Sequence, residues 1–421
     1  MDDHLYVYLH NVLAGQLARS KMQLSFQYDA SYLDYDKAQP ISAALPLQIQ
    51  PFANDVVKPF FSGLLPEGLV RVKLAHLFQT SPDNIFELLR EMGADCAGAI
   101  TILPPGQGPD CLKENSYKFL TDHEAAQILS TLNTRPLYAG SGDFRVSGAG
   151  VQDKLIACLI DNKLALPLYG TPSTHIFKTA IQDFKGSVFN EYFCMQLAEL
   201  CGLNVPQTAI HFFDKTPCYI ITRYDRKQLA HGQTVRLHQE DFCQILGVDS
   251  ENKYENEGGP NVKNCFDLLN CLGVSGTDRI QFLEMLMFNF LIGNGDAHAK
   301  NFSILYDDRA AILAPFYDLM STILYAPFAP KHKMAMKLPE GDYLFRYVRR
   351  KYFENLRAVT GFRKDFILKR LDGLLSKIIP LAEHLSRQLA DGYASNIYAE
   401  ITKVIKQHVA QIADRFNEAH V

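Results

Sequence analysis

An apolar stretch that ends in closely spaced polar residues constrains this chain more than any other feature. Residues 282–292 are largely apolar and run into Gly-Asn-Gly at residues 293–295. Because glycine lets the backbone take positive φ, the sequence predicts that the apolar segment ends in a turn here. A carboxylate, an imidazole and a carboxamide follow within six residues, at Asp296, His298 and Asn301. We therefore expect a rigid scaffold to present these polar side chains at a functional site.

The spacing of Asp296 and Asn301 suggests a chemistry for that site. They lie five positions apart, as in the protein-kinase catalytic loop, where Asp accepts the proton of the substrate hydroxyl and Asn holds a metal ion. Asp318 follows where a second, metal-holding Asp is needed. On the Asp-x4-Asn pair alone, a polar loop whose side chains cap turns is the better interpretation. The glycine turn, the flanking apolar segments and the later Pro-Phe-Tyr-Asp favour the catalytic one.

Composition sets outer limits on the class of protein. The 421 residues are 47% apolar and 21% charged, enough for two or three domains or for one two-lobed enzyme with an appendage. The net charge of -4 gives no reason to expect the chain to bind nucleic acid or a membrane by itself. Nine cysteines without a Cys-x2-Cys pair predict small core residues in a reducing cytosol. No basic leader and no bilayer-length apolar run is evident, so we expect a cytoplasmic protein.

The order of the predicted elements divides the chain into three parts. The first, residues 1–105, has strand patterns at 5–9, 12–17 and 24–28 and two short helices at 70–78 and 84–92, with Asp83 as the N-cap of the second. It ends at a Pro- and Gly-rich linker at 104–109.

The two remaining parts differ in their secondary structure. Residues 106–230 carry a helix at 122–132, a glycine-rich loop, and strands at 155–160 and 174–178. Residues 231–421 are mostly helical, with strand-like runs at 302–306 and 310–313, a polar stretch at 247–262 expected to be an exposed loop, and two long helices between 362 and 408. A β-rich half followed by a helical half is the order of a two-lobed kinase.

Phosphoryl transfer needs a lysine, two metal ligands and a base. The protein catalyses it mainly by positioning these groups around the phosphates. Lys178, at a strand end, is placed to meet the α/β-phosphates, and Glu191 can hold its ammonium. Asn301 and Asp318 offer oxygen ligands that suit Mg²⁺, and Asp296 is the candidate base. Taken singly, Lys178 is equally a solvated strand end and Glu191 a helix first-turn residue favoured by the dipole.

The glycine-rich loop, residues 140–154, is ambiguous by itself. It lacks the Walker A pattern and a strict Gly-x-Gly-x-x-Gly, so a flexible hairpin is one interpretation. Its position before the first strand of the small lobe favours phosphate contacts by backbone N–H groups. The hydroxyl of Ser147 would then lie near the γ-phosphate, as a self-phosphorylation site.

These motifs together resemble the HipA family of bacterial serine/threonine kinase toxins. The resemblance covers nearly the whole chain and is carried by residues 61–68, 95–99, 147–154, 176–178, 190–191, 223–226, 237–242, 294–301 and 317–318.

The resemblance implies an α+β fold of protein-kinase type, with a β-rich N-lobe, an all-α C-lobe and an added N-terminal β/α subdomain. It implies ATP and Mg²⁺ as cofactors, Asp296 as the catalytic base, Asn301 and Asp318 as metal ligands, and Ser147 as the autophosphorylated off-switch. The residues that it assigns to the nucleotide site, including a hinge at 222–225, are Lys178, Ser147, Gly148, Ala149, Gly150, Val151, Lys154, Thr222, Arg223, Tyr224, Asp225, Gln239, His298, Lys300 and Tyr317.

The same resemblance implies partners. We expect a HipB-like helix-turn-helix antitoxin, operator DNA bound chiefly through that antitoxin, and a substrate among translation components, of which glutamyl-tRNA synthetase is the family's best-known type. No membrane partner is expected. Two other functions stay open: a kinase of small-molecule hydroxyls, and a catalytically silent co-repressor that acts with an antitoxin.

Overall fold

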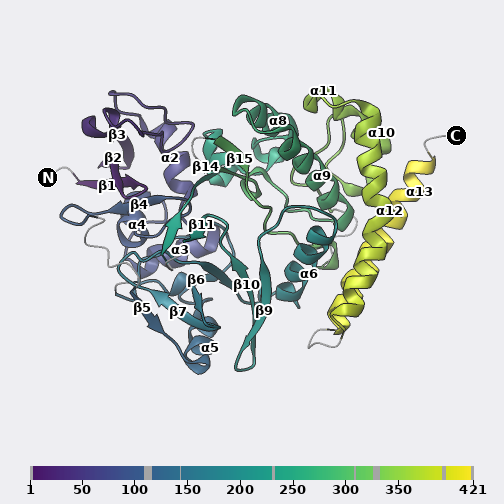
Figure 1. Cartoon of the computed structure of the whole chain (residues 1–421), viewed down its shortest axis with the longest axis horizontal. Coiled ribbons are helices and arrows are strands. Elements are labelled where there is room, and N and C mark those ends of the chain that lie inside the picture. The colour runs from purple at the N-terminus through teal and green to yellow at the C-terminus, as the bar shows by residue number, and fades with distance from the viewer. Residues whose placement is uncertain are drawn as a thin grey trace. The chain divides into compact units, whose positions relative to one another are not determined.

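The computed structural model describes residues 3–108, 116–142, 144–229, 233–307, 310–325, 332–390 and 395–418 (Figure 1). The chain divides into two compact units. The first consists of Met1–Thr179, His211–Glu251 and Ser303–Ala310. The second consists of Ala180–Ile210, Asn252–Phe302 and Ala311–Val421. The first unit thus combines the predicted N-terminal subdomain with most of the predicted N-lobe.

A four-stranded antiparallel sheet opens the first unit, in the order β3-β2-β1-β4. Its strands are β1 (Asp3–Leu9), β2 (Val12–Ser20), β3 (Gln23–Tyr28) and β4 (Ile100–Leu103). The turn from β1 to β2 has positive φ at both His10 and Asn11, which suits the twist of a tight hairpin. The three strands expected near the N-terminus are confirmed, and in β3 the alternating apolar residues face the core.

Four helices follow β3 along the chain: α1 (Ala30–Leu33), α2 (Asn54–Gly63), α3 (Gly68–Leu77) and α4 (Ile85–Met92). The predicted position of the α4 N-cap was wrong by one residue. The side chain of Asn84, not of Asp83, accepts the hydrogen bond from the Glu87 N–H. Asn84 stands directly before the first helical residue, where a side-chain oxygen reaches the third N–H of the helix.

The second sheet of this unit has the order β5-β7-β6-β8-β10-β9. Its strands are β5 (Tyr117–Phe119), β6 (Lys154–Ile160), β7 (Lys163–Pro167), β8 (His175–Lys178), β9 (Thr208–Phe213) and β10 (Thr216–Thr222). The chain passes from the second unit back into the first along β9. Helix α5 (Asp122–Thr131) begins with a capping box between Thr121 and Glu124, as the predicted helix requires. A short helix η2 (Pro136–Tyr138) precedes the glycine-rich loop.

Two smaller sheets follow. Strands β11 (Arg226–Gln228) and β12 (Thr234–Arg236) pair with each other. Strands β13 (His238–Asp241), β14 (Ser303–Asp307) and β15 (Ala310–Leu313) form a three-stranded sheet in the order β13-β14-β15. Helix α7 (Phe242–Ile245) follows β13 directly. One apolar core, from Leu5 to Ile220, includes buried residues on both sides of the predicted boundary at residue 105.

Helices make up most of the second unit. They are α6 (Ser187–Leu200), α8 (Val262–Cys271), α9 (Gly276–Ile292), α10 (Arg350–Asn355), α11 (Arg357–Thr360), α12 (Lys364–Gln388) and α13 (Ser395–Glu418). The two long C-terminal helices α12 and α13 were expected, and they pack side by side (Figure 1). Shorter elements of this unit are η4 (Glu255–Glu257), η5 (Ala299–Asn301), η6 (Thr322–Tyr325) and η8 (Phe345–Tyr347). The 3-10 turn η3 (Ser250–Asn252) begins in the first unit and ends in the second.

The stretch at residues 247–262 is not simply the exposed loop that its polarity predicted. It contains the 3-10 turns η3 and η4, and the side chains of Ser250 and Lys253 are buried. Tyr254 is half-buried. The polar residues are therefore a structured part of the protein.

Within the described part of the chain, no helix is both long and apolar enough to cross a membrane.

Candidate active site

The turn that follows α9 is built by two asparagines and a glycine. Gly293 ends the helix with a φ of 68°, and a Cβ there would lie 2.6 Å from the side chain of Ile323. Asn294 donates hydrogen bonds to the Asn289 backbone carbonyl (2.8 Å) and side-chain oxygen (2.9 Å). The Asn294 side-chain oxygen in turn accepts from the Asp296 N–H at 3.0 Å. The polar Asn289 within the apolar helix therefore anchors the turn that presents Asp296.

Asp296 and Asn301 are joined through the backbone. The Asn301 Nδ2 donates to the Asp296 carbonyl at 2.8 Å, and the His298 N–H donates to the same carbonyl at 2.9 Å. His298 is buried, whereas the Asp296 side chain is 52% exposed. Because the Asn301 nitrogen is used in this way, its Oδ1 is the atom left to act as a ligand. The predicted Asp-x4-Asn pair thus forms one compact turn.

Asp318 belongs to a neighbouring stretch of the same unit. The Tyr317 hydroxyl donates to the Lys300 carbonyl at 3.0 Å, so the residues before Asp318 and Asn301 are in contact. Asp318 has a φ of 56°. A non-glycine residue in the left-handed region costs on the order of 1–3 kcal/mol, and such strain concentrates at functional sites.

These residues fit a magnesium ion. The Asn301 Oδ1 and the Asp318 carboxylate are hard oxygen ligands, and Mg²⁺ in phosphoryl-transfer sites takes its other ligands from phosphate and water. In the described ranges no cluster of three or more His, Cys, Asp or Glu side chains has metal-site spacing. A site of one amide, one carboxylate, phosphate oxygens and water needs no such cluster.

In the first unit, two lysines lie opposite each other on paired strands. Lys154 of β6 pairs with Lys178 of β8, and both side chains are buried. Directly opposite residues of an antiparallel pair point to the same face, so two positive charges are held close together. That arrangement suits an anion, and the phosphates of a nucleotide fit it.

The glycine-rich loop is folded against residues of the predicted N-terminal subdomain. Ser147 is fully buried: its Oγ donates to the Leu64 carbonyl at 2.7 Å and its N–H donates to the Asp95 carbonyl at 3.0 Å. The Glu67 N–H donates to the Gly150 carbonyl at 3.1 Å. Ser147 must leave these contacts before its hydroxyl can meet a phosphate.

The remaining loop residues pack closely or face outward. A Cβ on Gly148 would lie 2.1 Å from the Cδ1 of Ile156, so a larger residue there would require the Ile156 side chain to move. The Lys154 ammonium donates to the Ala149 carbonyl, and the Val151 side chain is exposed.

The predicted hinge starts where β10 ends. Thr222 is the last residue of β10 and pairs with His175 of β8. The side chains of Arg223 and Asp225 are buried, whereas Tyr224 is half-buried.

A buried ion cluster ties the hinge to the segment at residues 95–98. The Arg223 guanidinium contacts Asp225 at 2.7 Å, and Arg226 reaches Asp225 at 2.8 Å and Asp95 at 2.9 Å. Arg236 lies 3.1 Å from Asp95. Burial by itself would raise the pKa of Asp95, but the three guanidinium groups outweigh it and hold that pKa below its usual value.

Gln239 lies on β13, beside the same segment. A Cβ on Gly98 would lie 2.8 Å from the Gln239 backbone nitrogen, so the close approach requires glycine. Within the described parts of the chain, the buried Oε1 of Gln239 accepts no hydrogen bond.

The predicted site residues therefore form two groups. Asp296, His298, Lys300, Asn301, Tyr317 and Asp318 share the second unit, whereas the glycine-rich loop, both lysines, the hinge and Gln239 share the first. Glu191 is buried on α6 of the second unit, so its pairing with Lys178 of the first stays a prediction.

Sequence reasoning missed three sets of contacts. These are the Asp95 cluster, the Leu64 carbonyl that holds Ser147, and Tyr254, whose hydroxyl donates to the Asp296 Oδ1 at 2.6 Å. Leu64, Asp95 and residues 223–226 lie in stretches that carry the family resemblance, whereas Tyr254 lies outside them.

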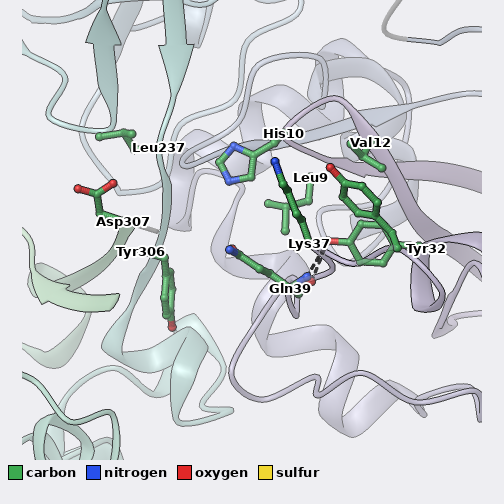
Figure 2. A pocket seen from close by; sticks show the side chains of 10 residues that line it. Leu9, His10, Val12, Tyr32, Lys37, Gln39, Leu237, Tyr306 and Asp307 are labelled. Atoms are coloured by element: carbon green, nitrogen blue, oxygen red, sulfur yellow. Dashed lines mark hydrogen bonds between the residues drawn. The ribbon is translucent and has the colours of Figure 1, made fainter. Parts of the chain in front are cut away.

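A separate pocket lies in the first unit. It has a volume of about 310 Å³, and His10, Lys37 and Gln39 face Leu237, Tyr306 and Asp307 across it (Figure 2). None of the predicted site residues is among those that line it.

Family models match two parts of the chain. The model of the HipA N-terminal domain matches residues 5–103, and that of the HipA-like C-terminal domain matches residues 146–379.

Curated relatives extend over most of the chain. The protein Y4mE of Sinorhizobium fredii is 42% identical, over 95% of this chain and 94% of its own length. The serine/threonine-protein kinase toxin HipA of Shewanella oneidensis is 30% identical, over 79% of this chain and 78% of its own.

A solved structure agrees with these matches. In the complex of HipA, HipB and operator DNA from Shewanella oneidensis, the matched chain superposes with a TM-score of 0.82 at 24% identity, covering 98% of this chain and 97% of that one. The predicted kinase-like α+β fold is thereby confirmed. On the family models and the relatives together, the chain belongs to the HipA family.

Proposed function

We propose that this chain is an ATP-dependent protein serine kinase that acts as the toxin of a toxin–antitoxin pair. The observation that carries the proposal is the turn in which the Asn301 Nδ2 holds the Asp296 carbonyl. It presents a half-exposed carboxylate and an amide oxygen from one turn, which would serve as the base and the metal ligand of phosphoryl transfer. The relative named as a serine/threonine-protein kinase toxin supports the same function.

Each group has a distinct task in this reaction. Bound ATP, with Mg²⁺, would supply the phosphoryl group and neutralise its charge. Asp296 takes the proton from the substrate serine hydroxyl, whose oxygen forms the new bond to the γ-phosphorus as the bond from that phosphorus to the β,γ-bridging oxygen breaks and ADP leaves. Asn301 and Asp318 would hold the magnesium ion, while Lys154 and Lys178 hold phosphate oxygens.

The other predicted nucleotide contacts are assigned according to their geometry. Because the Arg223 and Asp225 side chains are engaged in the ion cluster, the hinge would hold adenine through backbone groups at 222–225. Gln239, with its free Oε1, and His298 would shape the nucleotide and metal site.

We also propose that phosphorylation of Ser147 switches the enzyme off. A phosphoserine carries nearly two negative charges, which the buried position against the Leu64 carbonyl cannot accept. The loop would then leave its contacts with Asp95 and Glu67.

A HipB-like antitoxin with a helix-turn-helix is the proposed partner. The matched structure contains HipA with HipB and operator DNA. The net charge of -4 is consistent with DNA contact made chiefly through such a partner. The proposed substrate is a translation component, with an aminoacyl-tRNA synthetase such as glutamyl-tRNA synthetase as the first candidate.

Phosphoproteomics after brief expression tests the function and identifies the substrate. The parent chain should add phosphate to serine in a small set of proteins and arrest growth, whereas Asp296→Asn should do neither. Asp267→Asn is the matched control, because its side chain is also 52% exposed and lies in the same unit. Growth arrest by Asp296→Asn equal to that of the parent would exclude a catalytic mechanism. Arrest without any new phosphoserine would favour a small-molecule kinase.

A further inference from the structure

The Asp296 carboxylate is held by a residue from outside its own turn. The Tyr254 hydroxyl donates to Oδ1 at 2.6 Å, and the His298 Nε2 lies 3.8 Å from the same oxygen. In the described ranges, no hydrogen bond reaches the other oxygen, Oδ2. One carboxylate oxygen is thus fixed, and the second is left to face a substrate.

Tyr254 is itself held in a defined position. Its ring meets the buried His298 ring edge-on, with centroids 5.0 Å apart and planes at 84°. The Lys253 ammonium lies 5.6 Å from the Tyr254 ring centroid. The ring therefore has little freedom to move away from Asp296.

The backbone around Tyr254 is a tight turn that only glycine permits. The Gly259 and Glu257 N–H groups both donate to the Tyr254 carbonyl, at 2.9 and 3.0 Å. A Cβ on Gly259 would lie 2.2 Å from the Asn252 carbonyl oxygen, and Gly258 has a φ of 94°. Gly258 and Gly259 are thus required by the backbone geometry of this turn.

The turn is anchored at the next residue. The Glu255 carboxylate accepts from the Lys337 N–H at 2.8 Å, and the Glu255 N–H donates to the Ala335 carbonyl at 3.3 Å. All of these contacts lie within the second unit. Hydrogen bonds therefore hold in place the segment that presents Tyr254 to Asp296.

We propose that Tyr254 is a positioning residue for phosphoryl transfer, which orients the Asp296 carboxylate so that Oδ2 can take the substrate proton. The proposal rests on the kinase function proposed above. A half-exposed aspartate would otherwise sample several rotamers, and misplacement of a reacting group by about 1 Å costs on the order of 100-fold in rate.

The first test separates positioning from a structural role. A heat-treated bacterial lysate serves as the pool of serine substrates, and the rate of phosphoserine labelling from γ-labelled ATP is measured over a range of ATP concentrations. Tyr254→Phe should lower kcat by about 10- to 100-fold, the worth of one hydrogen bond to a charged group, with the KM for ATP changed less than about twofold. Tyr352→Phe, at another half-buried tyrosine of the second unit, should match the parent.

Rescue tests whether the hydrogen-bond donor is what matters. p-Aminophenylalanine at position 254 keeps the ring and an N–H donor, so it should recover part of the kcat that Tyr254→Phe loses. An unchanged or raised kcat in Tyr254→Phe would overturn the proposal, and a raised one would mean that the tyrosine blocks the base. Loss of kcat together with a rise in the KM for ATP would indicate a structural role.

A second test does not depend on activity. The melting temperatures of Tyr254→Phe, Asp296→Asn and the double variant form a cycle. Because either single change weakens the same hydrogen bond, the double variant should melt no lower than the less stable single variant. Additive shifts would overturn the contact. If the parent transfers no phosphoryl group, the kinase proposal fails, and this cycle still reports on Tyr254 and Asp296.

Discussion

Glu240 is a buried carboxyl group that titrates near neutral pH. Its Oε1 accepts hydrogen bonds from the Ala43 N–H at 3.0 Å and the Tyr306 hydroxyl at 2.8 Å. Burial raises the pKa of Glu240 to about 7, although these hydrogen bonds oppose the shift. The folded state therefore retains a proton that the unfolded chain has lost.

This shift predicts a pH dependence of stability. Between the unfolded pKa of 4.5 and the folded value of about 7, the folded state binds more protons, so stability falls as the pH rises through this window. Glu240→Gln keeps an acceptor oxygen and removes the titration. Its unfolding free energy relative to the parent should therefore rise by up to about 3 kcal/mol from pH 4.5 to 8, measured by urea unfolding.

Glu383 provides the control of opposite sign. The Lys406 ammonium hydrogen-bonds the Glu383 carboxylate and lowers its pKa, so Glu383→Gln should lose stability relative to the parent as the pH rises. A difference between Glu240→Gln and the parent that stays constant with pH would contradict the account of Glu240.

At the scale of elements, the glycine-rich loop depends on a buried serine. Ser147→Asp puts a charge against the Leu64 carbonyl, and we expect it to displace the loop and weaken the binding of a fluorescent ATP analogue at least 10-fold. Ser147→Ala removes only the hydroxyl, so it should retain binding and lose about 1 kcal/mol of stability. Equal affinities of the two variants would exclude the proposed off-switch.

The buried ion cluster around Asp95, beside the predicted hinge, should be costly to break. Asp95→Asn leaves Arg226 and Arg236 without their buried carboxylate, and we expect a loss of about 3–5 kcal/mol in the unfolding free energy. Asp372→Asn is the matched control: Asp372 forms a two-armed ion pair with Arg350 at 2.7 Å, but it is exposed. Its loss should cost at most about 1 kcal/mol. Similar costs for the two variants would mean that the Asp95 cluster is not held as described.

Elements with a regular apolar period were predictable from the sequence, and those stabilised by polar partners were not. Strand β3 was expected from its alternation. Strand β13 reads His-Gln-Glu-Asp, without an apolar residue, and forms because it pairs with β14.

The site shows the same limit. Asp296, Asn301 and Asp318 could be predicted as site residues because their spacing follows from one chemistry. Tyr254 and Asp95 were assigned no role because their partners lie 42 and 131 residues away. Contacts at such separations are set by tertiary packing, which no local pattern records.

At the scale of the whole molecule, the proposed reaction draws on both units. Lys178→Met in the first unit and Asp318→Asn in the second should each reduce phosphoryl transfer by at least 100-fold. Neither change should shift the melting temperature by more than a few degrees. Full activity in either variant would remove that residue from the site, as measured by phosphoserine labelling.

Transfer of label from γ-labelled ATP to serine, by the purified chain in a heat-treated lysate, tests the central claim most directly. The parent and Asp267→Asn should label the same few proteins on serine, and Asp296→Asn should label them at least 100-fold more slowly. Labelling by Asp296→Asn at the parent rate, or no serine labelling by the parent, would contradict the claim that this chain is a serine kinase with Asp296 as its base.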